Sequence, residues 1–406
     1  MVSSGTRSMR SLAPETTLLY ARQLAATAGI SEVRDITDLD VLGVPVFLSV
    51  RPHALADKFT FGKGLRRTDA EVGAYMEALE FFFAEPENNR VLTRQGTVRD
   101  VAGQELHDDA ILNFVPLLER EIDLDGPILL ASVRDLETGA KCSIPAELIF
   151  YPARNARNIG QRIFGSSTNG LASGNTLVEA SIQGLLELIE RDIWSFENLR
   201  GASKSVDIES WPGEVREIAE RAARNGLHLK VRTVPNDYGM PFFVAFIFDP
   251  NIPSRKSFNG GWACDLNRER ALVRAVTEAA QSRLAFIHGG RKVRTRQTAT
   301  AEDRDREAKL VKRQMLAVSD TREQMSFSDI PDLNAAGTLQ QKFEMVIERL
   351  RRVVKAPIYR AVLTSPESPL QVVRLVVPLL ENLKENQVRV GPRLKEAIDA
   401  LSARAA

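Results

Sequence analysis

The stretch from Ser166 to Asn198 constrains the fold more than any other, because small polar residues give way there to a clear helical periodicity. Thr176 is a suitable N-cap residue, and Glu179 three residues later completes the pattern of a capping box. Beyond the cap, apolar residues recur at the spacing of one helical face: Ile182, Leu185, Leu186, Ile189 and Ile193. The stretch therefore predicts a long helix that buries one side in a core.

The same helix carries an acidic flank beside its apolar face. The flank consists of polar and charged residues, with a guanidinium at its edge: Glu179, Gln183, Glu187, Glu190 and Arg191. Carboxylates at these spacings repel one another by roughly a few tenths of a kcal/mol each, and buried carboxylates need partners. One interpretation is a solvated acidic face with an ordinary cap. The other is a site where a divalent cation neutralises the carboxylates and the Gly/Asn/Ser-rich approach contacts a polyanion.

The run NGLASGNTLVEASIQGLLELIERD, residues 169–192, resembles the central signature of the YcaO family, NGxAxGNTxxEAxxxGLxExxERD. The resemblance extends over roughly residues 30–395 in four ordered motif blocks. It implies an α/β (mixed α+β) fold, with sheets packed by helices and an ATP site between helices in place of a P-loop. Members of this family bind ATP and magnesium, and they activate a peptide backbone amide by phosphorylating its oxygen.

A second informative stretch begins with the sequence FTFGKGLRRTDAE. It predicts a GKG turn around Lys63, and then a helix that opens with a capping box formed by Thr68 and Glu71. Glu77 and Glu80 follow on one face of this helix. Taken alone, the stretch is typical of a surface turn and a helix with two exposed acids.

The resemblance gives these acids a role, because it implies that carboxylates of both helices bind magnesium: Glu77, Glu80, Glu187 and Glu190. Magnesium usually takes one or two protein carboxylates per ion, so this set implies two ions. The family usually has a serine where this chain has Gly73. The hydroxyl is then either absent or supplied by Thr68.

A third stretch, residues 265–291, predicts a helix with Arg274, Glu278, Gln281 and Arg283 along a polar side. Without the other motifs it would be a charged surface helix. The resemblance implies that Arg283 contacts phosphate and that Glu278 and Gln281 orient it. Asp265 stands where family members often have a histidine.

By the same resemblance, the catalytic residues are Arg191 and Arg283. The implied ATP-binding residues come from all three stretches: Lys63, Asn175, Glu179, Arg191, Gln281 and Arg283.

Composition excludes several classes of function. The net charge is +1, so nothing indicates attraction to nucleic acid or to an anionic membrane. No apolar run is long enough to span a bilayer, and two isolated cysteines fit a reducing cytoplasm. Four histidines without paired spacing argue against zinc, and no GxxxxGK[ST] motif is present.

The remaining pattern alternates between helices and strands. We expect an N-terminal tail and helix in residues 1–30, then a YcaO domain in 31–400, with 292–340 as a charged insertion that is either mobile or a solvated helix. Pro241–Phe248 is apolar throughout, which predicts a strand buried on both faces. Ala146–Tyr151 is expected to be a strand, and Asn259–Gly261 a turn.

Three functions remain open. The N-terminal pattern resembles family members encoded beside TfuA proteins, which make thioamides, so thioamide formation with a TfuA-like partner is the first expectation. The second expectation is cyclodehydration of Cys, Ser or Thr in a precursor peptide. It ranks lower because the chain shows no PxPxP tail, which azoline-forming members often have. A non-catalytic scaffold that binds a peptide is the third, and Gly73 and Asp265 are the departures that favour it. A homodimer is also possible.

Overall fold

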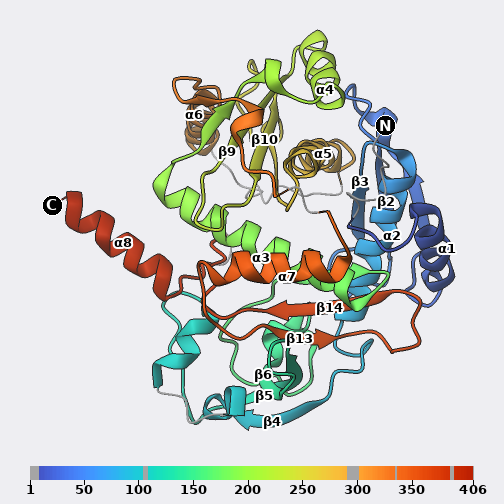
Figure 1. Cartoon of the computed structure of the whole chain (residues 1–406), viewed down its shortest axis with the longest axis vertical. Coiled ribbons are helices and arrows are strands. Elements are labelled where there is room, and N and C mark those ends of the chain that lie inside the picture. Colours follow the sequence, from blue (N-terminus) through green and yellow to red (C-terminus); the bar gives the residue numbers. More distant parts are fainter. Residues whose placement is uncertain (1–8, 104–107, 290–300, 334–335, 385–387, 406) are drawn as a thin grey trace.

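The computed structural model describes residues 9–103, 108–289, 301–333, 336–384 and 388–405. In this part of the chain, eight helices and three sheets form a mixed α/β fold, which confirms the predicted fold class (Figure 1). The N-terminal elements lie along one side of the molecule, and the last helix, α8 (Pro392–Ala405), projects from the opposite side. The predicted division of the chain at residue 30 stays a prediction.

The first sheet is three-stranded and antiparallel. Its strands are β1 (Glu32–Asp35), β2 (Val46–Val50) and β3 (Phe59–Lys63). Helix α2 (Arg67–Ala84) packs against β2 and β3, and α1 (Pro14–Ala25) packs against α2. The sheet and α2 approach closely at Gly62, where an added Cβ atom would lie 1.9 Å from the carbonyl oxygen of Ala70. No side chain fits between the two elements at this point.

The second sheet has five strands in the order β11-β10-β9-β8-β12. They are β8 (Lys204–Val206), β9 (His228–Thr233), β10 (Phe242–Phe248), β11 (Asn259–Cys264) and β12 (Gln324–Met325). Helix α5 (Arg268–Ile287) covers β10 and β11, and α4 (Gly213–Arg224) packs on β9. Strand β10 is buried on both faces, as predicted, because Phe242 and Phe243 belong to different core clusters.

The third sheet runs in the order β4-β5-β13-β14-β7, with β6 paired to β5. Its strands are β4 (Thr93–Thr97), β5 (Pro127–Asp135), β6 (Lys141–Pro145), β7 (Leu171–Gly174), β13 (Tyr359–Val362) and β14 (Gln371–Val376). All of its pairings are antiparallel. Strand β7 leads directly into the central helix and so ties this sheet to the start of that helix.

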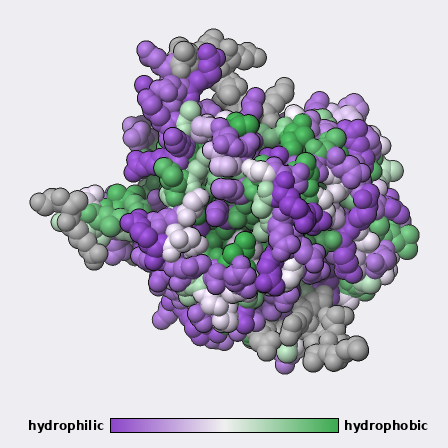
Figure 2. Space-filling model, turned by 90° about the horizontal axis from the view of Figure 1, so that it is seen from above, coloured by the Kyte–Doolittle hydropathy of each residue, from purple (hydrophilic) through white to green (hydrophobic). Residues whose placement is uncertain are grey.

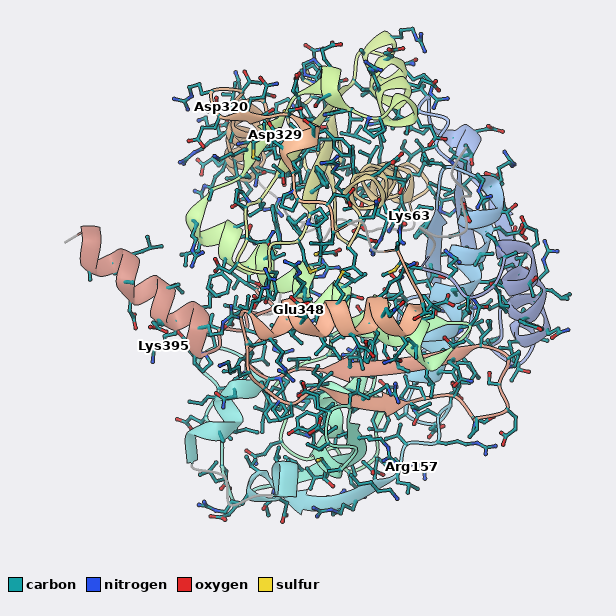
Figure 3. The ribbon with its side chains drawn as sticks, in the orientation of Figure 1. Lys63, Arg157, Asp320, Asp329, Glu348 and Lys395 are labelled. Atoms are coloured by element: carbon teal, nitrogen blue, oxygen red, sulfur yellow. The ribbon has the colours of Figure 1, made fainter. Side chains whose placement is uncertain are left out.

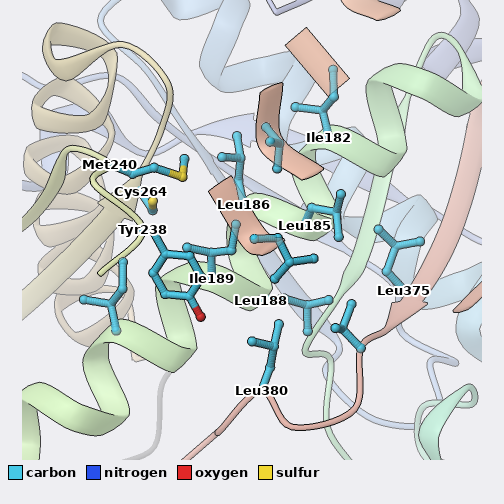
Figure 4. Packing of buried hydrophobic residues seen from close by; sticks show 14 of the residues in the cluster. Ile182, Leu185, Leu186, Leu188, Ile189, Tyr238, Met240, Cys264, Leu375 and Leu380 are labelled. Carbon is cyan, nitrogen blue, oxygen red and sulfur yellow. The ribbon is translucent and has the colours of Figure 1, made fainter. Parts of the chain in front are cut away.

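The central helix, α3 (Leu177–Arg200), packs against β7 and β14 on one side and β11 on another. Helix α7 (Leu339–Arg351) lies beside it. The predicted apolar stripe is buried against residues from both sheets (Figure 4), and each of its five members is at most 4% exposed: Ile182, Leu185, Leu186, Ile189 and Ile193. Burial of each such side chain contributes roughly 1.5–3 kcal/mol, so α3 holds the second and the third sheet together.

Half of the predicted capping box exists at α3, and none of it at α2. The Thr176 hydroxyl accepts a hydrogen bond from the backbone N–H of Glu179, as expected, but the Glu179 carboxylate is bound elsewhere. At α2 the N-cap residue is Arg66, with no side-chain cap, and Glu71 pairs with Arg22 of α1. In both cases a tertiary partner replaces the local one, a contact that sequence spacing alone does not encode.

Three further local expectations were wrong. Asn259–Gly261 begins strand β11 and does not form a turn, because it pairs with β10 along its whole length. Gly62 and Lys63 end strand β3 and are not part of a tight turn. Ala146–Tyr151 contains a short 3₁₀ turn at Ala146–Leu148 where a strand was expected. Apolar runs of this length suit either conformation.

The charged segment 292–340 contains α6 (Ala301–Val318), most of whose described side chains are exposed. This helix also buries Val311 and Met315 against Phe248, so it is packed on one side. Residues 292–300 lie outside the described ranges, and the description of 292–340 as an insertion stays a prediction. The face of the molecule in Figure 2 is largely hydrophilic, with small separated apolar areas. Within the described residues, no helix has the length and apolar character needed to cross a bilayer.

The close packing of α5 on β11 predicts a large effect of one methyl group. In Gly261→Ala, the new Cβ atom would lie 2.3 Å from the backbone nitrogen of Ala279 and 2.4 Å from the carbonyl oxygen of Ala275. We expect this variant to lose about 1–3 kcal/mol of unfolding free energy, measured by urea denaturation. Gly213→Ala is the matched control, because nothing lies within 4 Å of its added Cβ atom. Equal stability of the two variants would contradict the packing described here.

Candidate functional site

Helices α2 and α3 bring the four predicted metal carboxylates into one electrostatic cluster. The Glu80 carboxylate of α2 interacts with Glu77 of the same helix and with Glu187 of α3. Glu187 in turn interacts with Glu190, one turn further along α3. Two helices about one hundred residues apart in sequence therefore present their acids to a common space, as the motif order indicated. Their role as metal ligands stays a prediction.

Three of these four carboxylates are also held by a donor from a neighbouring element. The backbone N–H of Phe61 donates to Glu77 (2.8 Å), the hydroxyl of Ser173 to Glu80 (2.5 Å), and the backbone N–H of Cys264 to Glu190 (3.0 Å). Among the described residues, no three acidic, histidine or cysteine side chains already converge in a metal-holding arrangement. Like charges without a cation turn towards such donors, and a bound cation would draw them together.

Burial raises the pKa values of three of these acids, Glu80, Glu187 and Glu190. Burial raises the pKa of Glu80 to about 8; Ser173 opposes this shift by hydrogen bonding, and Glu77 and Glu187 add to it. The pKa of Glu190 is raised to about 7, again mainly by burial. The pKa of Glu187 is raised for the same reason. A cluster that resists ionisation in this way is a favourable place for a cation, which lowers such pKa values.

Two cations lie beside the acids. Lys63, at the end of β3, forms a 3.1 Å ion pair with Glu278 of α5, and Figure 3 shows it between α5 and the first sheet. Arg191 lies over the ring of Trp262, 5.3 Å from its centroid, and its Nε has no hydrogen-bond partner among the described residues. Burial lowers the pKa of Arg191, but the nearby Glu190, Glu187 and Glu278 together raise it above its ordinary value.

Helix α5 contributes more to the site than the sequence suggested. Glu278, expected to orient Arg283, instead belongs to the cluster, because it interacts with Lys63, Arg191 and Arg274. The pKa of Glu278 is lowered, since these cations outweigh the effect of its burial. Arg274 also interacts with Glu190, so it joins the acids of α3 to those of α5. The repeat of polar residues along the helix was the only sequence signal for both.

Asp265, one of the two departures from the family pattern noted in the sequence, has a clear structural role. It is fully buried, and its carboxylate pairs with Arg270 at 2.9 Å and with Arg274 at 3.4 Å. Arg274 also donates to the carbonyl oxygen of Cys264. The aspartate therefore fixes the guanidinium that faces Glu190, which makes it a positioning residue for the cluster.

Gly73, the other departure, lies where α2 approaches β3. An added Cβ atom there would lie 3.1 Å from the Cα atom of Gly62. This is tighter than ordinary van der Waals contact, so a serine would require the strand to move by a few tenths of an ångström. Thr68 lies in the first turn of α2, and whether it supplies the hydroxyl stays a prediction.

The two predicted ATP-binding residues on α5, Arg283 and Gln281, have different surroundings. Arg283 binds the carboxylate of Asp40, with its Nε 3.0 Å from Oδ1. Gln281 is 8% exposed, and its Oε1 has no hydrogen-bond partner within the described part of the chain. The roles of both residues towards nucleotide stay predictions.

The remaining two, Asn175 and Glu179, are joined to each other and to the N-terminal segment. The Asn175 amide donates to both oxygens of Glu179 at 3.1 Å. The backbone N–H and hydroxyl of Ser11 also donate to Glu179, at 3.0 and 2.8 Å, and the Thr17 hydroxyl donates to Asn175. These polar groups lie at the start of α3, eight residues before Glu187. Their contact with nucleotide stays a prediction.

The raised pKa values predict that metal–nucleotide binding releases protons. At pH 7 Glu80 is mostly protonated and Glu190 is about half protonated, whereas metal ligands must be carboxylates. We expect release of about one proton per Mg·nucleotide bound at pH 7, and affinity that rises with pH until both groups have ionised. Calorimetry in two buffers of different ionisation enthalpy measures the protons, and Glu80→Gln should reduce them. A binding enthalpy independent of buffer would contradict this.

Comparison with known proteins agrees with the motif order. The family model described as YcaO cyclodehydratase, ATP- and Mg²⁺-binding, matches residues 61–381. An uncharacterized protein in the tfuA 3′ region of Rhizobium leguminosarum bv. trifolii is 31% identical, covering 96% of this chain and 93% of the relative.

Solved structures share the fold. YcaO from Methanopyrus kandleri, bound with AMPPCP and Mg²⁺, matches with a TM-score of 0.73 at 24% identity, over 94% of this chain and 96% of that one. A heterocyclase in complex with substrate and cofactor gives a TM-score of 0.74 at 18% identity, over 98% of this chain and 56% of that one. The chain belongs to the YcaO family, whose model is that of ATP- and Mg²⁺-binding proteins.

Proposed function

We propose that the protein uses ATP and Mg²⁺ to phosphorylate the oxygen of a peptide backbone amide, and that sulfide then replaces this oxygen to give a thioamide. The observation that carries the proposal is the cluster of carboxylates from α2, α3 and α5, accompanied by Lys63 and Arg191. A site with this many acids and cations in one buried space suits a metal–triphosphate better than an apolar ligand.

The residues present fit magnesium, a hard cation that takes oxygen ligands. Glu77 and Glu80 from α2, with Glu187 and Glu190 from α3, would hold it. When bound, magnesium supplies neutralisation of the charge that develops on a transferred phosphoryl group.

The chain's own cations complete the neutralisation. Arg191 lies against Trp262 and beside three carboxylates, so its guanidinium is fixed before any ligand arrives. Lys63 is held at the end of β3 by Glu278. A rigid arrangement of this kind stabilises a transition state without the cost of reorganisation. These positions give a triphosphate the cationic contacts that a P-loop supplies in other proteins.

The chemistry follows from the leaving group. An amide oxygen leaves poorly, and its phosphoryl ester leaves well as phosphate. In the overall reaction the amide, ATP and hydrosulfide give the thioamide, ADP and hydrogen phosphate. The amide oxygen ends in the phosphate, and the proton of hydrosulfide ends there too, so no other reactant is required.

The choice of a thioamide product is supported by the relative in the tfuA 3′ region. It matches nearly the whole of this chain and points to a TfuA-like partner protein. A second candidate is azoline formation, in which a side-chain thiol or hydroxyl of the peptide attacks the same activated carbon. The fold shared with a heterocyclase bound to substrate favours that reaction. A non-catalytic scaffold is less well supported, because Asp265 and Gly73 both have structural roles in this chain.

Mass spectrometry of a peptide treated with protein, partner, ATP, Mg²⁺ and sulfide tests the proposal. Exchange of oxygen for sulfur adds about 16 Da, and water loss subtracts about 18 Da, since activation of the same amide precedes both outcomes. A product that has lost water would favour the azoline alternative, and ATP binding without any product would favour the scaffold.

The metal assignment predicts which acids matter. Glu187→Gln and Glu190→Gln should lower product formation by about 100-fold or more, because each neutralises a ligand within the cluster. Glu348→Gln is the control, an equivalent change on the outer side of α7 (Figure 3), and should leave the rate unchanged. Retained metal-dependent nucleotide binding in both α3 variants would overturn the assignment.

The two cysteines of the chain predict an external sulfur source. Burial raises the pKa of the Cys264 thiol well above its ordinary value, and burial also raises that of Cys142. Since the thiolate is the reactive form, neither residue is suited to carry sulfur to the substrate. We expect the double variant Cys142→Ala, Cys264→Ala to keep the +16 Da product, with supplied sulfide, at a rate within about twofold of the parent. Loss of product from a folded double variant would contradict this.

A further inference from the structure

A cavity lies between helix α3 and strand β14, next to the acidic cluster but not part of it. It is small, with a cavity volume of about 30 Å³, and it is partly open to solvent. One part of its wall is apolar and includes Leu188 and Leu380, two residues that Figure 4 shows close together. The other part is polar and contains Asn169, Arg374, Asn382 and Arg389.

Arg374 is held rigidly in this wall by neutral partners. It is 3% exposed, its Nε donates to the carbonyl oxygen of Leu148 at 2.8 Å, and its Nη2 donates to that of Ser167. Its remaining nitrogen, Nη1, has no hydrogen-bond partner among the described residues. A buried cationic donor without an acceptor is costly, which indicates a ligand that accepts from it.

Arg389 is built in the same way. It is 7% exposed, and its Nε and Nη2 donate to the carbonyl oxygens of Val115 and Phe114. Its guanidinium lies 5.6 Å from the centroid of the Phe164 ring. Burial lowers the pKa of Arg374 and of Arg389 to about 10, so both remain charged near neutral pH.

Two asparagines, Asn169 and Asn382, line the same cavity. Asn382 is 3% exposed, and neither its Oδ1 nor that of Asn169 has a hydrogen-bond partner in the described part of the chain. An asparagine side chain can turn its NH₂ group where its oxygen now points, so both can donate to an anion.

The cavity adjoins the acidic cluster through Glu187, which precedes Leu188 on α3. Glu187 interacts with Arg374 and with Lys384, and Lys384 also interacts with Arg389. Glu147 and Glu381 face Arg389, but each already accepts backbone N–H groups. Once Glu187 binds metal, as the proposed function requires, Arg374 and Lys384 lack an anionic partner.

We propose that this cavity is a subsite for a small, weakly hydrated anion, and that the anion is the hydrosulfide used in the proposed function. The cationic donors exclude a metal ion or an amine. The apolar wall disfavours strongly hydrated anions such as phosphate, because it offers nothing in place of their water. Hydrosulfide in the cavity lies beside the acidic cluster where the amide is activated. Its sulfur forms the new bond to carbon as the bond from carbon to the phosphate oxygen breaks, and its proton leaves with the phosphate.

The binding test uses bromide as a probe of similar charge and softness. Crystals of the full chain soaked in bromide should show an anomalous peak in the cavity, and hydrosulfide should displace it. Asn382→Asp, which is nearly isosteric, should abolish the peak, because its carboxylate occupies the donors and repels anions. Asn198→Asp, the same change at an exposed position of α3, should keep it. Absence of bromide from the cavity, or displacement by phosphate but not by hydrosulfide, would overturn the proposal.

The kinetic test separates this subsite from the proposed function on which it rests. In Asn382→Asp the KM for sulfide should rise about tenfold or more while the KM for ATP stays within about twofold. Equal rises in both constants, or no rise for sulfide, would overturn the subsite. Failure of the proposed function looks different, since the unaltered protein would then give no +16 Da product while bromide still bound in the cavity. Arg374→Gln is a less suitable variant, because Arg374 also holds two backbone carbonyls.

Discussion

The structure depends on one electrostatic constraint, the burial of several carboxylates of like charge between helices α2, α3 and α5. Burial raises the pKa of Glu80 and Glu190 far enough for both to titrate near neutral pH. Such an arrangement costs stability in the absence of cations, so selection for stability alone would not produce it. The surrounding elements offset part of this cost. Lys63 at the end of β3 pairs with Glu278, a backbone N–H of β11 donates to Glu190, and Arg191 packs on the ring of Trp262.

Much of this could be predicted from sequence because the signals were long and periodic. The apolar stripe of α3 and the wholly buried strand β10 were visible as patterns of spacing, and both are found as expected. The motif blocks predicted that Glu77 and Glu187 belong to one site, although the secondary structure between them could not be predicted in detail. Local details failed where a distant residue decides the outcome. Glu179 does not complete its capping box, because Ser11 binds it.

The residues that sequence reasoning missed share one property: only the tertiary fold gives them a role. From its position on the helix, Glu278 was expected to orient Arg283. It pairs instead with Lys63, on a strand 215 residues earlier in the sequence. Arg374 lies in strand β14 and Lys384 follows it, and neither was among the site residues predicted from sequence. Their importance comes from burial beside Glu187, which no local pattern reveals. From the sequence, Asp265 was only a departure from the family pattern, whereas in the structure its carboxylate holds Arg274 in position.

The hydrogen bonds from Ser11 to Glu179 have a practical consequence for handling the protein. Any change that displaces the segment from Ser11 to Thr17 would also remove donors from Glu179 and Asn175, two candidate nucleotide contacts. The opposite terminus follows α8, which points away from the body of the molecule and carries Lys395 on its outer surface (Figure 3). Attachment to a surface is therefore best directed to the exposed side of α8, for example through Lys395, which lies far from that segment.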